Sequence, residues 1–274
     1  MAEGVIESTQ FEIDNLVLIS GTGLSIDIKF LSQDINIYED IFSSVISGDI
    51  LINDTQNLPA TFNLHGSEYI YIKLTTPTLN SFERYFRVYK ISNLNLRNLN
   101  SFSYTIHFCS EEFVLNQQKR VSKSYKNVRN SDIVNDLLKN YLKVSDDRMK
   151  TSTIEETKII QNLIVPNMKP LEAINWISTF SINDKLSSAY MFYETQDGFN
   201  FRSLDSIYND PVYKNITLNP KNLLTDKDQK IISTFVPDRF EIKQAFDILE
   251  TESNGGYSSS MIKIDLTAQQ HKKT

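Results

Sequence analysis

A strictly alternating run at residues 69–74 constrains the fold of this chain more than any other feature. The run reads YIYIKL, so that tyrosine and lysine side chains alternate with purely aliphatic ones. A period of two places the aliphatic set on one face of a β-strand and the other set on the opposite face. The alternation therefore predicts a half-buried strand, with Tyr69 and Tyr71 on the face away from the core.

Further runs of this kind occur up to residue 109, and turn-forming residues separate them. Apolar or alternating stretches lie at residues 16–19, 24–30, 50–53, 84–94 and 101–109. Gly48 precedes one of these runs and the pair Asn53-Asp54 follows it, as expected where the backbone turns. The stretch YEDIFSSVISG, residues 38–48, fits either two turns of helix or a strand. Residues 1–112 are thus predicted to form a mainly β domain of about six strands.

The hydrophobic period changes after residue 112. Apolar side chains recur at helical spacing over residues 131–142, with Ser131 as the expected N-cap, and over residues 170–181, where Pro170 suits the first helical position. Alternation returns at residues 190–204 around Asp197-Gly198 and predicts a β-hairpin. We interpret the basic run at residues 119–129 as a solvated connector in preference to a partner-binding patch. Residues 113–214 are predicted to be an α/β insert domain.

The last part of the chain, residues 215–274, is predicted to be a linker followed by one hairpin around residues 254–256. A single hairpin is marginally stable on its own. We therefore expect this hairpin to belong to a second β domain that is incomplete here, and the protein to continue past Thr274. The predicted fold class is α+β.

Charge is distributed unevenly along the chain. Residues 1–110 carry 6 lysines and arginines against 12 aspartates and glutamates, a net charge of −6, whereas the remainder is balanced. An acidic domain repels phosphate backbones at close range, which argues against a grip on nucleic acid. No apolar run approaches the roughly 18 residues of a membrane span, and no signal peptide is visible, so we expect a soluble cytoplasmic protein without a membrane partner.

The sequence offers no recognisable catalytic, cofactor or metal site. The histidines at 65, 107 and 271 share no metal-ligand spacing, and Cys109 lies in an alternating run where a small core residue is expected. His65 and Glu68 fit a turn before a strand better than an acid–base pair. No phosphate-binding loop, dinucleotide fingerprint or nucleophile elbow is present in the sequence. We therefore expect no enzyme activity and no cofactor.

Two segments resemble baseplate central hub proteins of contractile-tailed bacteriophages. The first is IFSSVISGDILINDTQNLPATFNLHGSEYIYIKLTTP, with a Ser-Gly turn, a short strand ending in Asn-Asp, an apolar-His-Gly-x-Glu motif and a strand ending in Thr-Pro. The second is PLEAINWISTFSINDKLSSAYMFYETQDGFNFRSLDSI, with a Trp-containing helix, a Ser-Ser-Ala strand and a hairpin. The resemblance covers residues 38–110 and 130–210, and it lies in the order and spacing of the motifs.

The resemblance implies a tube-type antiparallel β domain, an α/β insert and part of a second tube-type β domain. It further implies a homotrimeric structural ring that joins the three-fold central spike to the six-fold tail tube and surrounds the channel for DNA and tape measure. The implied partners are the spike protein, a tail tube or tube-initiator protein and, as a further option, baseplate wedge proteins. DNA would pass without specific binding. The implied location is the virion tail baseplate, after assembly in the host cytoplasm.

The candidate lumen-facing or interface residues are those that flank or occupy the strands of the first domain: Asp49, Asp54, Glu68, Tyr69 and Tyr71. An acidic lumen would let DNA slide without sticking, because the charges are alike. Two alternatives stay open from the residues themselves. One is a monomeric α+β binding module that recognises a glycan or a protein, and the other is a spike-associated hydrolase whose site is assembled from distant residues.

Overall fold

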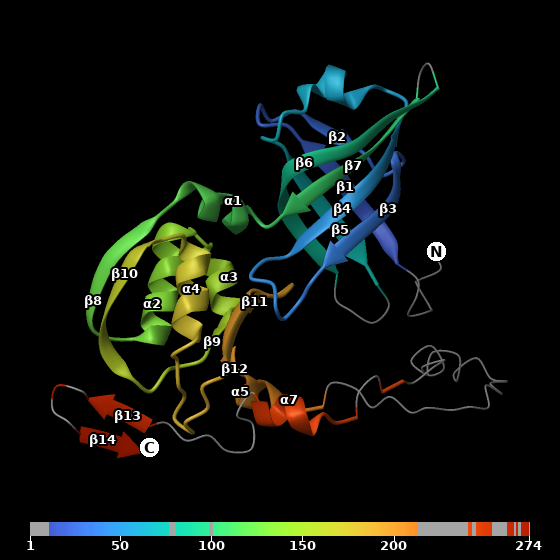
Figure 1. Ribbon diagram of the computed structural model, residues 1–274. Helices are drawn as coiled ribbons and strands as arrows, with labels where there is room; N and C mark the ends of the chain where they lie inside the picture. The colour runs from blue at the N-terminus through green and yellow to red at the C-terminus, as the bar shows by residue number, and fades with distance from the viewer. Residues whose placement is uncertain are drawn as a thin grey trace. The chain divides into compact units, whose positions relative to one another are not determined.

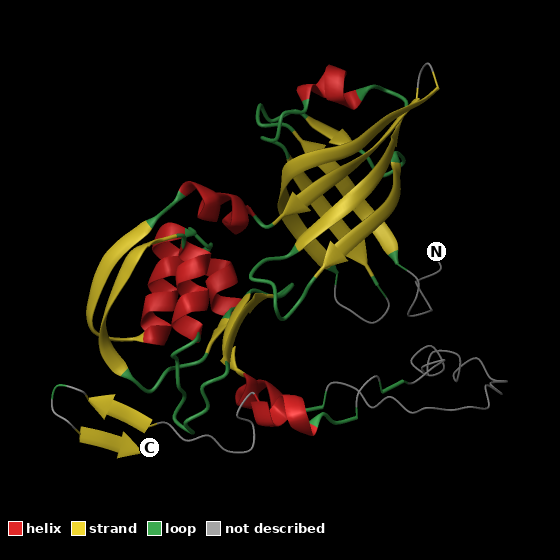
Figure 2. Cartoon of the chain, viewed as in Figure 1, coloured by secondary structure: helices red, strands yellow, loops and turns green. Residues whose placement is uncertain are grey.

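The computed structural model describes residues 11–76, 81–98, 101–212, 241–242, 245–253, 262–265, 267 and 270–273. Helices and strands are both well represented, and the largest sheet is antiparallel (Figures 1 and 2), which confirms the predicted α+β class. The chain divides into two compact units, Met1–Lys214 and Asn215–Thr274, and each is described by itself. We propose in addition that boundaries at residues 112 and 214 divide the chain into the β domain, the insert, and the linker with its partial β domain.

The first part of the larger unit is a curled sheet of seven antiparallel strands in the order β2-β1-β5-β6-β7-β4-β3 (Figure 1). The strands are β1 (Glu12–Ile19), β2 (Ser25–Asp27), β3 (Ser32–Tyr38), β4 (Ser47–Asp54), β5 (Tyr69–Thr75), β6 (Phe82–Asn98) and β7 (Ser101–Cys109). A short π-helical segment, η1 (Pro59–Asn63), lies between β4 and β5.

The period of two in the sequence produces the core of this sheet. Ile50 and Ile52 of β4 and Ile70 and Ile72 of β5 are fully buried. They pack with the other buried side chains of the cluster, among them Leu16, Leu18, Phe86, Tyr104, Ile106 and Phe108. The strands predicted at 69–74 and 101–109 are confirmed, and β6 extends further than the predicted 84–94.

The ambiguous stretch at residues 38–48 is neither an amphipathic helix nor a strand over most of its length. Strand β3 ends at Tyr38, and residues 39–46 form a connection of turns before β4 begins at Ser47. Its two neighbouring apolar residues serve different cores, because Val45 packs into the insert and Ile46 into the sheet. Because the segment contacts two cores, its apolar residues follow neither the helical nor the strand periodicity.

The insert follows with helices packed against two small sheets. Its elements are α1 (Glu111–Gln118), β8 (Val121–Arg129), α2 (Asn130–Asp136), η2 (Leu137–Tyr141), α3 (Asp146–Thr151), β9 (Thr153–Ile154), β10 (Ile160–Met168), α4 (Pro170–Ser178), β11 (Tyr190–Glu194), β12 (Phe199–Ser203) and α5 (Leu204–Tyr208). Strand β8 pairs with β10, and the other sheet has the order β11-β12-β9. The predicted hairpin at 190–204 is confirmed.

The helices agree in position with the predictions but not in every boundary. The helix expected at 131–142 is α2 continued by the π-helical η2, and the helix expected at 170–181 ends at Ser178. Ser131 is not the N-cap. Strand β8 runs directly into α2, so the extended residue Arg129 occupies the cap position and Ser131 lies inside the helix.

The basic run at 119–129 is not a solvated connector, because most of it forms strand β8. Val121 and Tyr125 are buried in the insert core. Lys123 forms an ion pair with Asp136, 2.8 Å between nitrogen and oxygen. A strand with two buried residues four positions apart shows no alternation in its sequence, and this is why the prediction failed.

The smaller unit contains α7 (Ile248–Ser253), β13 (Ile262–Asp265) and β14 (Gln270–Lys273) among its described residues. The hairpin predicted around residues 254–256 is wrong in its first arm, where α7 is helical, and its turn lies outside the described residues. Strands β13 and β14 form an antiparallel pair instead. Among the helices described here, none combines the length and the apolar character that a membrane crossing requires.

Candidate interaction surface

The outward face of the sheet carries a group of tyrosines that we call the tyrosine face: Tyr38, Tyr69, Tyr71 and Tyr85. Tyr71 of β5 lies directly opposite Tyr85 of β6, and their ring centroids are 4.7 Å apart. Tyr85 is 60% exposed, so this ring pair is open to a partner. Tyr69 lies opposite Arg87, whose guanidinium carbon is 4.5 Å from the tyrosine ring centroid.

Hydrogen bonds to carboxylates fix three of these tyrosines. The hydroxyl of Tyr69 donates to Glu111 over 2.7 Å and that of Tyr71 donates to Glu83 over 2.8 Å. The hydroxyl of Tyr38 donates to Asp49 over 2.9 Å.

These hydrogen bonds also change the acidities of the groups involved. The bond to Glu83 is the main reason that the pKa of Tyr71 is raised to about 12, and the same bond holds the pKa of Glu83 below its usual value. Tyr38, Tyr69 and Tyr71 are therefore each held in place by a carboxylate.

Three of the five predicted surface residues lie on this face. Tyr69 and Tyr71 are partly exposed on β5, and Asp49 is partly exposed on β4. Besides the Tyr38 hydroxyl, Asp49 accepts a hydrogen bond of 3.2 Å from the side-chain amide of Asn36. Strand β7 lies between the Tyr38–Asp49 pair on β3 and β4 and the tyrosines on β5 and β6.

Asp54 and Glu68 do not contribute to the exposed face, because both side chains are fully buried. The carboxylate of Asp54 accepts hydrogen bonds from the backbone N–H groups of Gln56 and Leu58, at 2.7 and 2.6 Å. Glu68 accepts from the backbone N–H groups of His65 and Gly66, at 2.9 and 2.7 Å. Each carboxylate satisfies the donors of a turn next to its strand, and we remove both residues from the proposed surface set.

The carboxylates of Glu83 and Glu111 were missed by sequence reasoning. Glu83 lies across the β5–β6 pair from Lys73, and Glu111 belongs to α1. Their proximity to the tyrosines depends on the strand register and on where α1 begins, and neither is encoded in a local motif. A correct pairing of β5 with β6 would have identified Glu83.

A buried group of charges connects the sheet to the insert, and we call it the Glu194 cluster: Arg84, Glu112, Arg148 and Glu194. One oxygen of the fully buried Glu194 accepts from Arg84 of β6 and from Arg148 of α3. The other accepts from the Ser110 hydroxyl at 2.6 Å and from the Ile46 backbone N–H at 2.7 Å. Glu194 thus joins the hairpin of the insert to the sheet.

Glu112 is the less satisfied carboxylate of this cluster. One of its oxygens accepts from Arg148, whereas its Oε2 atom is buried without a hydrogen-bond partner among the described residues. Burial is the main cause that raises the pKa of Glu112 above its usual value, although Arg148 acts in the opposite direction.

Replacing Glu112 with glutamine is expected to remove a pH-dependent loss of stability. A raised pKa means that the folded chain holds its proton over a pH range in which the unfolded chain has lost it, so stability falls as pH rises through that range. Glutamine cannot ionise, and the variant should lack this component. Unfolding free energies of both proteins, measured from about pH 4 to about pH 8, test this. Parallel pH profiles would contradict the assignment.

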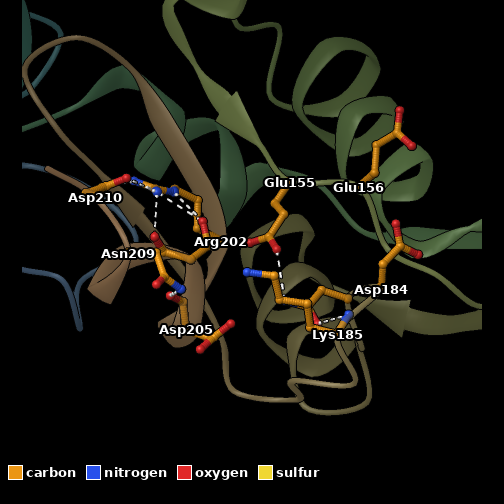
Figure 3. A pocket seen from close by; sticks show the side chains of 10 residues that line it. Glu155, Glu156, Asp184, Lys185, Arg202, Asp205, Asn209 and Asp210 are labelled. Atoms are coloured by element: carbon orange, nitrogen blue, oxygen red, sulfur yellow. Dashed lines mark hydrogen bonds and ion pairs between the residues drawn. The ribbon is translucent and has the colours of Figure 1, made fainter.

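A pocket of about 460 Å³ lies in the insert (Figure 3), and it is lined by Glu155, Glu156, Asn183, Asp184, Lys185, Arg202, Asp205, Ser206, Asn209 and Asp210. One ion pair joins two of its charged side chains, Arg202 and Asp210. Arg202 donates to both oxygens of Asp210 at 2.7 Å, which raises the pKa of Arg202 and lowers that of Asp210. Glu155 accepts from the backbone N–H and the hydroxyl of Ser203. These contacts stabilise the end of β12.

Cys109 is buried, as expected for a core residue, and burial raises the pKa of its thiol to about 12, which keeps the sulfur protonated. Within the described part of the chain, no three histidine, cysteine or acidic side chains form a group that could hold a metal ion.

No family model and no curated protein matches the chain. The similarities that were found are to solved structures. A 43 kDa tail protein of prophage MuSo2 from Shewanella oneidensis is 8% identical, with a TM-score of 0.45 over 69% of this chain and 54% of that chain. A tail protein from Neisseria meningitidis MC58 is 12% identical, with a TM-score of 0.47 over 74% and 53%.

An E. coli component of the type VI secretion system, described as similar in structure to bacteriophage T4 tail proteins, is 11% identical. Its TM-score is 0.44, over 78% of this chain and 51% of that chain. This chain therefore spans about half the length of these three solved structures. Identities of 8–12% and TM-scores below 0.5 assign no family to it.

Proposed function

We propose that this chain is a structural subunit of a phage tail, a baseplate hub ring that joins the three-fold central spike to the six-fold tail tube around the channel for DNA and tape measure. The observation that carries the proposal is the tyrosine face, in which Tyr38 and Tyr85 are exposed and carboxylates fix Tyr38 and the partly exposed Tyr69 and Tyr71. Aromatic side chains are enriched at protein interfaces, and fixed rings lose little conformational freedom on binding. The sequence resemblance over residues 38–110 and 130–210 points to the same role.

The ends of the sheet also suit assembly. Strands β2 and β3 are the two edge strands, and each pairs on one side with a neighbouring strand of the described sheet. Edge strands present backbone N–H and C=O groups that another chain can pair with. Closed rings of identical subunits use heterologous contacts, in which one surface of a chain meets a different surface of the next, and two different edge strands could provide them. We therefore propose a homotrimer in which the sheets of neighbouring chains form the wall of the ring.

The Glu194 cluster supports a rigid wall. Four hydrogen-bond donors from the sheet and the insert meet at one buried carboxylate, so the hairpin β11–β12 is tied to β6 and to the start of β4. A ring that joins a six-fold tube to a three-fold spike needs rigid subunits. As further parts of the proposal, the partners are a spike protein and a tail tube or tube-initiator protein, DNA passes without specific binding, and the chain has no catalytic role.

Counting the copies of this chain in the assembled tail tests the proposal. We expect three copies around the axis in an electron cryomicroscopy reconstruction, between a six-fold tube and a three-fold spike. Six copies would make the chain a tube or adapter protein instead. A position on the outside of the baseplate would end the hub proposal altogether.

The second candidate function is a monomeric module that binds a glycan or a protein. The exposed ring pair of Tyr71 and Tyr85 favours it, because aromatic rings also serve as binding platforms. Native mass spectrometry of purified chain together with its spike separates the two. The module should stay monomeric in that mixture, whereas the hub subunit should form a trimer on the spike.

A further inference from the structure

We propose that the tyrosine face receives an extended segment of a partner protein that carries arginine side chains at alternate positions. The inference deepens the proposed function and rests on it for the setting, since it names the chemistry of the surface that meets this face.

Three of the four tyrosine hydroxyls of the face have already used their protons. Tyr38, Tyr69 and Tyr71 each donate to a carboxylate of the chain. A phenolic hydroxyl has one proton to donate, and an ionised carboxylate only accepts. At these three tyrosines the face therefore offers acceptor oxygens and ring surfaces, and a partner has to supply the donors.

The cations next to the ring pair are also committed within the chain. Lys73 forms an ion pair with Glu83, 3.2 Å between nitrogen and oxygen. Arg87 lies on the ring of Tyr69. Because the segment 1–110 as a whole carries 12 acidic side chains against 6 basic ones, its charge favours a cationic partner.

The chain itself contains the contact that we propose for the partner. Arg87 lies over the Tyr69 ring, and Tyr69 donates to the carboxylate of Glu111, so ring, cation and carboxylate occur together. The neighbouring pair of Tyr71 and Tyr85 has the rings and the carboxylate of Glu83, which is paired with Lys73. Within the described residues no cation lies over the Tyr85 ring, which is 60% exposed.

The spacing of the tyrosines fits an extended segment. Tyr69 and Tyr71 are two positions apart on β5, and a strand rises about 3.3 Å per residue, so their side chains repeat about every 6.6 Å. Alternate side chains of an extended peptide repeat at the same distance. Arginine suits the site better than lysine because its planar guanidinium stacks on aromatic rings and binds carboxylates through two parallel hydrogen bonds.

A titration monitored by fluorine NMR tests this inference on the purified full chain with fluorotyrosine incorporated. The probe is the capped peptide Thr-Arg-Thr-Arg-Thr, and the matched probe carries citrulline, a neutral analogue, in place of arginine. The resonances of Tyr71 and Tyr85, identified with the variants Tyr71→Phe and Tyr85→Phe, should shift with the arginine peptide. The citrulline peptide should bind roughly tenfold more weakly.

Variants of the chain locate the binding. Glu83→Gln removes the carboxylate beside the ring pair and should weaken binding of the arginine peptide roughly fivefold. The control Tyr208→Phe alters a tyrosine on α5 that is 79% exposed, and it should bind as the unaltered chain does. Thermal melts of each variant confirm that it is folded.

Equal binding of the two peptides would overturn the inference, and so would unshifted Tyr71 and Tyr85 resonances at about 10 mM arginine peptide. The outcome is independent of the hub proposal. A copy number other than three in the tail would end that proposal and leave this titration unaffected. A failed titration with three copies in the tail would end this inference alone.

Discussion

Replacing Glu194 with alanine is expected to lower the free energy of unfolding by about 3–5 kcal/mol. The change leaves Arg84 and Arg148 facing each other without their shared carboxylate, and Arg84 is largely buried. It also removes the acceptor for the Ser110 hydroxyl and for the Ile46 backbone N–H. Breaking a buried ion pair by removing one partner is costly because the remaining charge stays out of water.

Urea unfolding measures this loss, and a matched variant separates it from a general effect of charge. Glu156 forms an ion pair with Arg129, but its side chain is 80% exposed, so Glu156→Ala should cost no more than about 1 kcal/mol. Hydrogen exchange adds a local readout, because the Ile46 amide loses its acceptor in Glu194→Ala alone. Similar losses in both variants, with an unchanged Ile46 amide, would contradict the central position of Glu194.

The sheet could be predicted from the sequence where one face is buried and the other is exposed. Residues 69–74 alternate because β5 is paired on both sides and covers the core with one face. The hairpin at 190–204 shows the same alternation in its burial. Strand β8 does not, because it pairs with β10 alone and its lysines and serines face outward on most positions. Polar strands of two-stranded sheets carry too little periodic signal to be recognised.

The candidate surface could be predicted in part for the same reason. Asp49, Tyr69 and Tyr71 face outward because they alternate with buried isoleucines. Asp54 and Glu68 lie at strand ends, where a carboxylate can turn inward to satisfy backbone donors, and the alternation rule stops there.

The Glu194 cluster could not be predicted from the sequence. Glu194 and Arg84 are 110 positions apart in the chain, and their meeting depends on how the insert packs on the sheet. No local pattern of residues specifies a contact of this kind.

Replacing Gly48 with alanine is expected to destabilise the sheet by about 3 kcal/mol, near the upper end of the cost of overpacking a core. A Cβ atom on Gly48 would lie 2.3 Å from the backbone oxygen of Asn36 in β3 and 2.3 Å from Cζ of Phe108 in β7. Phe108 is fully buried, so its ring has little space to move. The backbone of β3 would have to move away from β4, which disturbs the edge strand that we assign to contacts between subunits.

Urea unfolding of Gly48→Ala beside Ser47→Ala tests the steric explanation, since Ser47 is the neighbouring residue on β4 and is partly exposed. Ser47→Ala should stay within about 0.5 kcal/mol of the unaltered chain, as is usual for substitutions away from buried contacts. If the two variants unfold at the same urea concentration, the close approach of β3 and Phe108 does not restrict position 48 to glycine. If Gly48→Ala is destabilised as expected, its edge strand β3 is displaced, and trimer formation on the spike should weaken together with stability. Ser47→Ala should assemble as the unaltered chain does.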